Sequence, residues 1–327
     1  MDPQNIWRVT EQNFKALALD IFRFQYHTNL VYQAFCNTLN VDPVSVTSME
    51  KIPFLPIQFF KSHEIVATSF EPHAIFESSG TTGATPSRHY VKDLEVYRTS
   101  FTTTFRRFYG APADWCIMGL LPSYLERKNS SLVLMVDELV QQSCHPESGF
   151  YLSDFERLKD TVEALEQRQQ KTLLVGVTFA LLDFAETNKF NLNHTIVMET
   201  GGMKGRRREL TRAEVHELLS KSFGVDQIHS EYGMTELLSQ AYSAGGGRFT
   251  CPPWMKVFVR EEDDPFAIHR SGDTVSSGAA NIIDLANLYS CSFIATDDAA
   301  KLHPDGSFEI LGRLDSSDVR GCSLLSV

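Results

Sequence analysis

Hydrophobic residues near the start of the chain recur at the spacing of an α-helix. Five of them fall at positions i, i+3, i+4, i+7 and i+8: Phe14, Leu17, Ala18, Ile21 and Phe22. This spacing places them on one face and predicts a helical segment within the first forty residues. Pro43, Pro53 and Pro56 then interrupt the pattern and indicate a connecting segment.

Further along, short apolar stretches alternate with helical patterns. The expected strands are residues 65–67, 74–76, 114–121, 173–177, 195–198 and 225–229. Residues 131–136 begin either a helix or another strand. The pairs Ser153 with Glu156 and Thr211 with Glu214 read as capping boxes that open two helices. Strands and helices in this rhythm predict an α/β fold with mixed and largely parallel sheets flanked by helices.

Turn-forming residues become more frequent from about residue 245, which favours β structure there. We therefore expect two parts. Residues 1–244 form an α/β core that includes the N-terminal helical segment, and residues 245–327 form a β-rich C-terminal subdomain.

Composition narrows the function classes. The 327 residues are 43% hydrophobic and 22% charged, as in ordinary globular proteins, and the net charge of −11 argues against a nucleic-acid partner. One basic run, residues 204–208, is better explained as the solvent-exposed start of a helix than as a site for a CoA phosphate or an acidic carrier protein. Six scattered cysteines without a C-x-x-C pair indicate neither a zinc site nor disulfides, which favours a reducing cytoplasm. No secretory signal or membrane span is expected.

A loop rich in hydroxyls and glycines is the first candidate for chemistry. After Glu77 it comprises Ser78, Ser79, Gly80, Thr81, Thr82 and Gly83. Glycines let backbone N–H groups converge on an anion, and hydroxyls add donors, so a polyphosphate is the expected ligand. No Lys-Ser or Lys-Thr follows at the spacing of a Walker loop. From these residues alone a solvated turn is an equal alternative.

A second motif, Tyr232-Gly233-Met234-Thr235-Glu236, changes that balance. Together the two segments resemble the signature loops of the acyl-adenylate-forming superfamily, which includes acyl-CoA ligases, luciferases and the adenylation domains of peptide synthetases. The resemblance implies that Tyr232 lies against adenine, with Gly233 in the same nucleotide-binding segment. It also implies that Thr235 donates to the α-phosphate of ATP and that Glu236 binds Mg²⁺.

Other implied positions lie between and beyond the two motifs. Gly201 and Gly202 resemble the segment that lines the purine pocket. Asp298 matches the residue that accepts hydrogen bonds from the ribose, although Asp297 beside it keeps that choice open. Arg313, in a motif that resembles the hinge of these enzymes, is implied to reach the ribose and phosphate of ATP or AMP. Residues 175–184 resemble the segment that lines the acyl pocket, but an ordinary core would use the same residues.

Two departures refine the resemblance. The lysine that usually ends the phosphate loop is absent, which leaves Arg88 or His89 to supply its charge, and the sequence ends six residues after Gly321. A lid domain is therefore not expected. With residues 318–324, these features resemble the LuxE-type acyl-protein synthetases. That family implies activation of a fatty acid, transfer to a thiol, here Cys322, and delivery to a partner such as a reductase or carrier protein. A CoA ligase or acyltransferase and a non-catalytic nucleotide-binding relative remain alternatives.

Overall fold

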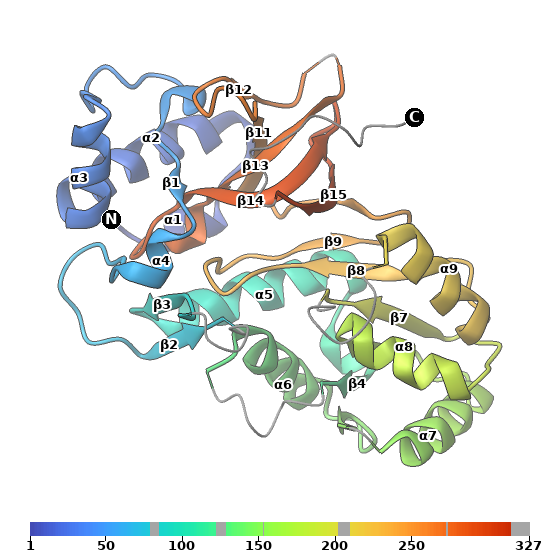
Figure 1. Ribbon diagram of the computed structural model, residues 1–327. Helices are drawn as coiled ribbons and strands as arrows, with labels where there is room; N and C mark the ends of the chain where they lie inside the picture. Colours follow the sequence, from blue (N-terminus) through green and yellow to red (C-terminus); the bar gives the residue numbers. More distant parts are fainter. Residues whose placement is uncertain (79–84, 122–128, 153, 202–209, 273, 315–327) are drawn as a thin grey trace.

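The computed structural model describes residues 1–78, 85–121, 129–152, 154–201, 210–272 and 274–314. Two sheets dominate it. In Figure 1 the sheet that contains β11, β13, β14 and β15 lies above the sheet that contains β4, β7, β8 and β9. Parallel and antiparallel strands are both present, with helices packed against them, so the predicted α/β class is confirmed.

The lower sheet is parallel except at one edge. Its order is β5-β4-β6-β7-β8-β9, and only β9 runs antiparallel to its neighbour. Its strands are β4 (Cys116–Leu120), β5 (Gly149–Phe150), β6 (Thr172–Gly176), β7 (Thr195–Glu199), β8 (His229–Tyr232) and β9 (Ala241–Ser243). Every residue of β4 and β6 is buried, as expected of parallel strands covered on both faces.

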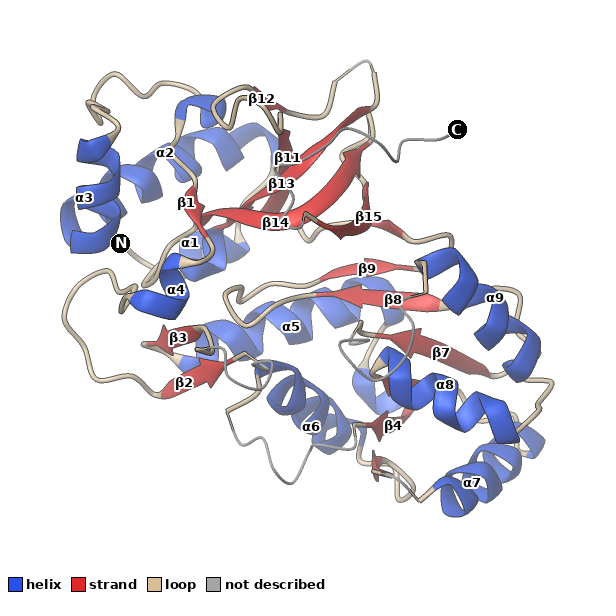
Figure 2. Ribbon diagram, in the orientation of Figure 1, coloured by secondary structure: helices blue, strands red, loops and turns tan. Residues whose placement is uncertain are grey.

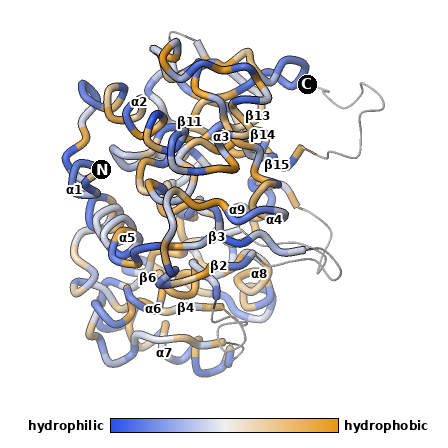
Figure 3. The backbone as a smooth tube through the Cα atoms, turned by 90° about the vertical axis from the view of Figure 1, so that its left-hand side faces the viewer, coloured by the Kyte–Doolittle hydropathy of each residue, from blue (hydrophilic) through white to orange (hydrophobic). Residues whose placement is uncertain are grey.

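Helices cover both faces of this sheet (Figure 2). One face carries α5 (Leu94–Tyr109) and α6 (Ser131–Ser143), and the other carries α7 (Phe155–Gln167), α8 (Thr178–Thr187) and α9 (Arg212–Phe223). Hydrophobic and hydrophilic residues alternate along α5 and α7 in Figure 3, as expected of helices with one buried face. The two faces form separate apolar clusters, and alternate residues of β4, such as Ile117 and Met118, belong to different clusters.

The upper sheet is mainly antiparallel, with the order β10-β15-β14-β13-β11-β12. Its strands are β10 (Arg248–Phe249), β11 (Met255–Arg260), β12 (Ile268–His269), β13 (Ser276–Asp284), β14 (Phe293–Leu302) and β15 (Phe308–Arg313). The short strand β1 (Leu55–Pro56) pairs with β14 in parallel, although the two lie far apart in sequence. A separate hairpin joins β2 (Ala74–Glu77) to β3 (Arg88–Val91).

The N-terminal helices α1 (Gln4–Trp7), α2 (Glu11–Thr28) and α3 (Leu30–Thr38) pack beside the upper sheet (Figure 1). The fully buried Gln25 fixes α2 there. Its Nε2 donates to the carbonyl oxygens of Asn287 and Leu288, both at 2.9 Å, and its Oε1 accepts from Ser292 N at 2.9 Å. A further short helix, α4 (Phe59–Ser62), and the 3₁₀ turns η1 (Met49–Lys51), η2 (Pro112–Asp114) and η3 (Leu285–Asn287) complete the elements.

Most expected elements are confirmed, and three details are wrong. Residues 65–67 form no strand but an irregular segment, in which Ala67 N donates to Tyr289 O at 2.8 Å. The strand expected at residues 225–229 begins only at His229. Helix α7 is capped by Asp154, whose Oδ1 accepts from Arg157 N at 3.2 Å. The capping box of Thr211 and α9 is present as predicted, and residues 131–136 belong to a helix.

None of the described helices combines the length and apolar character needed to cross a bilayer.

Candidate active site

The base of the β2–β3 hairpin lies against the second motif. Ser87 N donates to Ser78 Oγ at 2.9 Å and Ser78 N donates to Ser87 O at 3.1 Å, which closes the hairpin at the start of the Ser/Thr/Gly loop. The Ser87 side chain lies close enough to the Glu236 carboxyl to lower its pKa. Two residues further along, His89 Nδ1 donates to Thr235 O at 2.9 Å. The structure thus joins the ends of the first motif to the second, across about 150 residues of sequence.

Tyr232, Asp298 and Arg313 also meet in space. Tyr232 ends β8, and its buried hydroxyl donates to Asp298 Oδ2 at 2.7 Å. Arg313 pairs with Asp298 across β14 and β15, and its Nε lies 3.6 Å from Asp298 Oδ1. Asp297 points elsewhere, because its carboxylate accepts from Gln58 Nε2 at 2.6 Å. Of the two adjacent aspartates, Asp298 is therefore the one beside Tyr232.

A buried carboxylate that sequence reasoning missed organises the neighbouring strand end. Glu199 closes β7, and its Oε2 accepts from Gly201 N at 2.7 Å and from Thr178 Oγ1 at 3.0 Å. Burial raises its pKa, but hydrogen bonding by His216 and the charge of Arg212 outweigh this and lower it to about 2. Glu199 is therefore ionised, and it connects the predicted purine segment with the start of α8, where the predicted acyl-pocket segment lies.

Arg212 extends this connection to the upper sheet. Its Nε lies 3.3 Å from Glu199 Oε1, and its NH1 donates to Ile310 O on β15 at 3.3 Å. Its guanidinium also lies over the ring of Phe249, 4.9 Å from the centroid. One side chain of α9 therefore links the end of β7 to the strand that carries Arg313.

A second buried carboxylate precedes the motif. Glu231 is 8% exposed, and burial, reinforced by the charge of Glu199, raises its pKa to about 8. A Cβ placed on Gly233 would lie too close to Glu231 Oε1, so a larger residue there would displace the end of the Glu231 side chain. Burial and then the Glu231 charge also raise the pKa values of Tyr97 and Tyr109. Glu231 thus lies in an aromatic interior and is largely protonated near neutral pH.

The two alternatives for the absent loop lysine differ in charge. Burial lowers the pKa of His89 to about 4, so its ring is neutral at pH 7. The Nε of Arg88 lies 3.7 Å from Glu77 Oε1, and the Arg88 side chain is 52% exposed. His89 therefore supplies no cation, and Arg88 already has an anionic partner.

Several predicted residues lie outside the described part of the chain: Ser79, Gly80, Thr81, Thr82, Gly83, Gly202 and Cys322. The basic run at residues 204–208 lies outside it as well. Their predicted roles stay predictions.

The surroundings of Glu236 show whether this carboxylate suits the Mg²⁺ that the sequence predicts. It is 5% exposed, and burial raises its pKa, whereas Ser87 and the charge of Arg313 lower it. A buried carboxylate of this kind gains from a nearby cation, and oxygen is the donor that Mg²⁺ prefers. The described residues contain no group of three or more His, Cys, Asp or Glu side chains that could hold a metal ion. Glu236 therefore fits an Mg²⁺ held largely by phosphates and water rather than by a protein cage.

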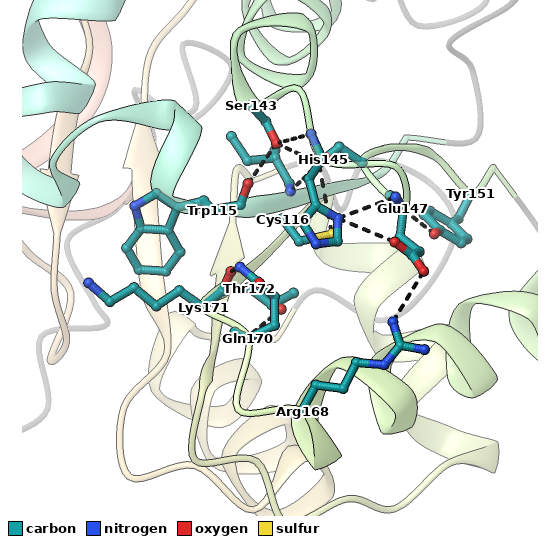
Figure 4. A network of polar contacts seen from close by, with 12 residues as sticks. Trp115, Cys116, Ser143, His145, Glu147, Tyr151, Arg168, Gln170, Lys171 and Thr172 are labelled. Atoms are coloured by element: carbon teal, nitrogen blue, oxygen red, sulfur yellow. Dashed lines mark hydrogen bonds and ion pairs between the residues drawn. The ribbon is translucent and has the colours of Figure 1, made fainter.

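Another polar cluster lies at the opposite edge of the lower sheet (Figure 4). Ser143 Oγ donates to Trp115 O at 2.6 Å, just before β4, and accepts from His145 N at 3.3 Å. Glu147 lies between His145 and Arg168, at 3.4 and 3.5 Å. No hydroxyl of the residues drawn in Figure 4 hydrogen-bonds to the His145 ring, so the cluster lacks the pairing of a nucleophile with its base. It holds the loop after α6 against β4.

A family model described as acyl-protein synthetase, LuxE, matches residues 6–326. Since this match covers nearly the whole chain, the chain belongs to the LuxE acyl-protein synthetase family. A search among curated proteins found no match.

Solved structures give more distant similarities. A long-chain-fatty-acid-CoA ligase from Archaeoglobus fulgidus shares 14% identity at a TM-score of 0.47, over 73% of this chain and 51% of the ligase. O-succinylbenzoate coenzyme A synthetase from Bacillus subtilis, in complex with AMP, shares 14% identity at a TM-score of 0.46, over 76% of this chain and 64% of the synthetase. A coronafacic acid ligase mutant from Pectobacterium brasiliense shares 17% identity at a TM-score of 0.42, over 62% of this chain and 39% of the ligase. This chain thus spans about half the length of these structures.

Proposed function

We propose that this chain is an ATP-dependent acyl-protein synthetase that activates a fatty carboxylic acid as an acyl adenylate. The observation that carries the proposal is the bond from His89 Nδ1 to Thr235 O, which joins the hairpin that bears the hydroxyl- and glycine-rich loop to the second motif. The family match supports the same activity.

The adenosine part of ATP fits beside Tyr232. An aromatic ring offers stacking area at low entropic cost, and the contact with Asp298 fixes this ring in one orientation. A carboxylate accepts several hydrogen bonds, so Asp298 can bind ribose hydroxyls together with the Tyr232 hydroxyl. Gly201, whose N–H is held by Glu199, is proposed to line the purine pocket.

The chemistry is a substitution at phosphorus. A carboxylate oxygen of the acid bonds to the α-phosphorus of ATP, the bond from that phosphorus to the α,β-bridging oxygen breaks, and pyrophosphate leaves with the electron pair of that bond. Protein groups contribute position and charge stabilisation rather than covalent chemistry. We assign Arg313 to the developing charge near the α-phosphate and Thr235 to a hydrogen bond there. When bound at Glu236, Mg²⁺ neutralises phosphate charge.

The second half-reaction needs a thiol. Burial raises the pKa of three described cysteines, to about 12 for Cys36 and Cys251 and to about 11 for Cys116, and that of Cys291 further still. Such thiols are poor nucleophiles. We propose, as the family resemblance implies, that Cys322 takes the acyl group as a thioester, with release of AMP, before delivery to a partner protein. We also propose a cytoplasmic location and a boundary between two parts near residue 244.

Fatty-acid-dependent exchange of labelled pyrophosphate into ATP tests the activation step. The wild-type chain should catalyse exchange with at least one chain length. Glu236→Gln should reduce it by one to two orders of magnitude, because the carboxylate that binds Mg²⁺ is lost. Glu217→Gln is the matched control, since Glu217 is exposed on α9 and pairs with Lys221. Absence of exchange with every acid tried, or full exchange in Glu236→Gln, would contradict the proposal.

A hydroxylamine-labile acyl label on the protein tests the acceptor. The label should disappear in Cys322→Ser and persist in Cys144→Ser, the control for the exposed described cysteine. A label that survives in Cys322→Ser would assign the acceptor to another residue.

A further inference from the structure

Helix α4 is held between the two parts of the candidate site. On one side, Gln58 Nε2 donates to both carboxylate oxygens of Asp297, at 2.6 and 2.7 Å, directly before Asp298. On the other side, the ring of Phe60 meets that of His89 edge-on with centroids 5.8 Å apart, and His89 bonds to Thr235 O. The segment that leads into α4 pairs with β14 through β1. These contacts fix the position of α4 next to both motifs.

Lys61 follows Phe60 on this helix. Its side chain is exposed, and it forms no ion pair with any residue that the structure describes. Lys61 comes three residues after Gln58, which bonds to Asp297, and one residue after Phe60, which packs against His89. The short helix therefore places Lys61 beside both parts of the site. Arg313, the other cation of this region, lies 3.6 Å from Asp298, whereas Lys61 has no such partner among the described residues.

We propose that Lys61 binds the phosphate groups of the nucleotide at this site and supplies the positive charge that the hydroxyl- and glycine-rich loop lacks. The inference rests on the proposed function, because it takes ATP as the ligand. A lysine ammonium is a compact charge with three donors on a flexible stem, suited to phosphate oxygens in several positions. Arg88, which has Glu77 beside it, and the neutral His89 are poorer sources of that charge.

Binding measurements with adenosine, AMP and MgATP test this role. Lys61→Met should weaken MgATP binding about tenfold, the usual size of a lost hydrogen bond to a charged group. It should leave adenosine binding unchanged, which also shows that the variant is folded. Lys61→Arg should restore most of the affinity. Lys51→Met, a change at another exposed lysine of the same region, should bind all three ligands as the wild type does.

The salt dependence gives an independent readout, since a lost phosphate contact lowers the sensitivity of MgATP binding to ionic strength. Equal MgATP affinity in Lys61→Met and wild type would overturn the inference, and so would an equal loss for adenosine and MgATP. These outcomes are distinguishable from failure of the proposed function. A wild-type chain that binds no nucleotide overturns both proposals, whereas one that binds MgATP without pyrophosphate exchange overturns only the activity.

Discussion

Replacing Glu231 with glutamine should change how the stability of the protein depends on pH. In the wild type this carboxyl group lies in an aromatic interior beside Tyr97, Tyr109 and Tyr242, and its pKa rises from the ordinary 4.5 to about 8. The folded state therefore keeps a proton that the unfolded chain releases above pH 4.5. The stability that this proton provides is complete below pH 4.5 and is lost as the pH rises through 8.

The magnitude follows from the shift. One pKa unit corresponds to about 1.4 kcal/mol, so a shift from 4.5 to about 8 corresponds to a loss on the order of 5 kcal/mol of unfolding free energy across that interval. A glutamine has nearly the same shape and no charge at any pH. Glu231→Gln should consequently be more stable than the wild type at pH 9, and the difference should shrink toward pH 5.

Urea unfolding at pH 5, 7 and 9, followed by circular dichroism, measures this difference. The comparison of variant and wild type cancels the contributions of other titrating groups. Glu217→Gln, which removes an exposed carboxylate of α9, is the control and should follow the wild type at each pH. If the stability difference between Glu231→Gln and the wild type is the same at all three pH values, the assignment of a buried protonated carboxyl is refuted.

Two further predictions concern neighbouring groups. Burial lowers the pKa of His89 to about 4, so the stability that its neutral ring provides is complete above pH 6.5 and is lost as the pH falls toward 4. In urea unfolding, the wild type should therefore lose about 3 kcal/mol of unfolding free energy over this range that His89→Gln does not lose. Glu199→Gln should lower the unfolding free energy by about 2 kcal/mol at pH 7, because Arg212 and His216 lose their buried anionic partner. Thermal unfolding measures this loss. The comparison variant is Glu166→Gln, which changes another carboxylate, on α7, that accepts a bond from a loop. An unchanged melting temperature in Glu199→Gln would contradict the prediction.

The helices and central strands could be predicted from the sequence, because their patterns are local. Period-3.6 spacing marks α2, and fully apolar runs mark β4 and β6. Strand β8 could not be placed correctly. Its residues 229–232 are His-Ser-Glu-Tyr, which carry no apolar signal, and they are buried only because distant helices and β9 cover them. The strand expected at 65–67 failed for the converse reason, since an apolar segment can be buried by a few contacts without joining a sheet.

In the candidate site, too, the residues in local sequence motifs could be predicted, whereas those that depend on distant contacts could not. The two motifs were found because together they resemble the signature loops of a known superfamily, and the structure brings Tyr232, Glu236 and Asp298 into one region. Glu199 left only a faint signal, a carboxylate at the end of an apolar strand, and Glu231 lies in a strand that carries no apolar signal. Their character depends on burial and on partners such as Arg212 from other elements, which no local pattern contains.

The pairing of β1 with β14 has a consequence for synthesis on the ribosome. Leu55 finds its partner Ile294 only after some 240 further residues have been translated, and Gln25 must wait still longer for Ser292. Until then the apolar side of α2 has no sheet to cover it. Nascent chains of this protein should therefore depend on chaperones late in translation, and slow closure of this long-range contact should limit the folding rate.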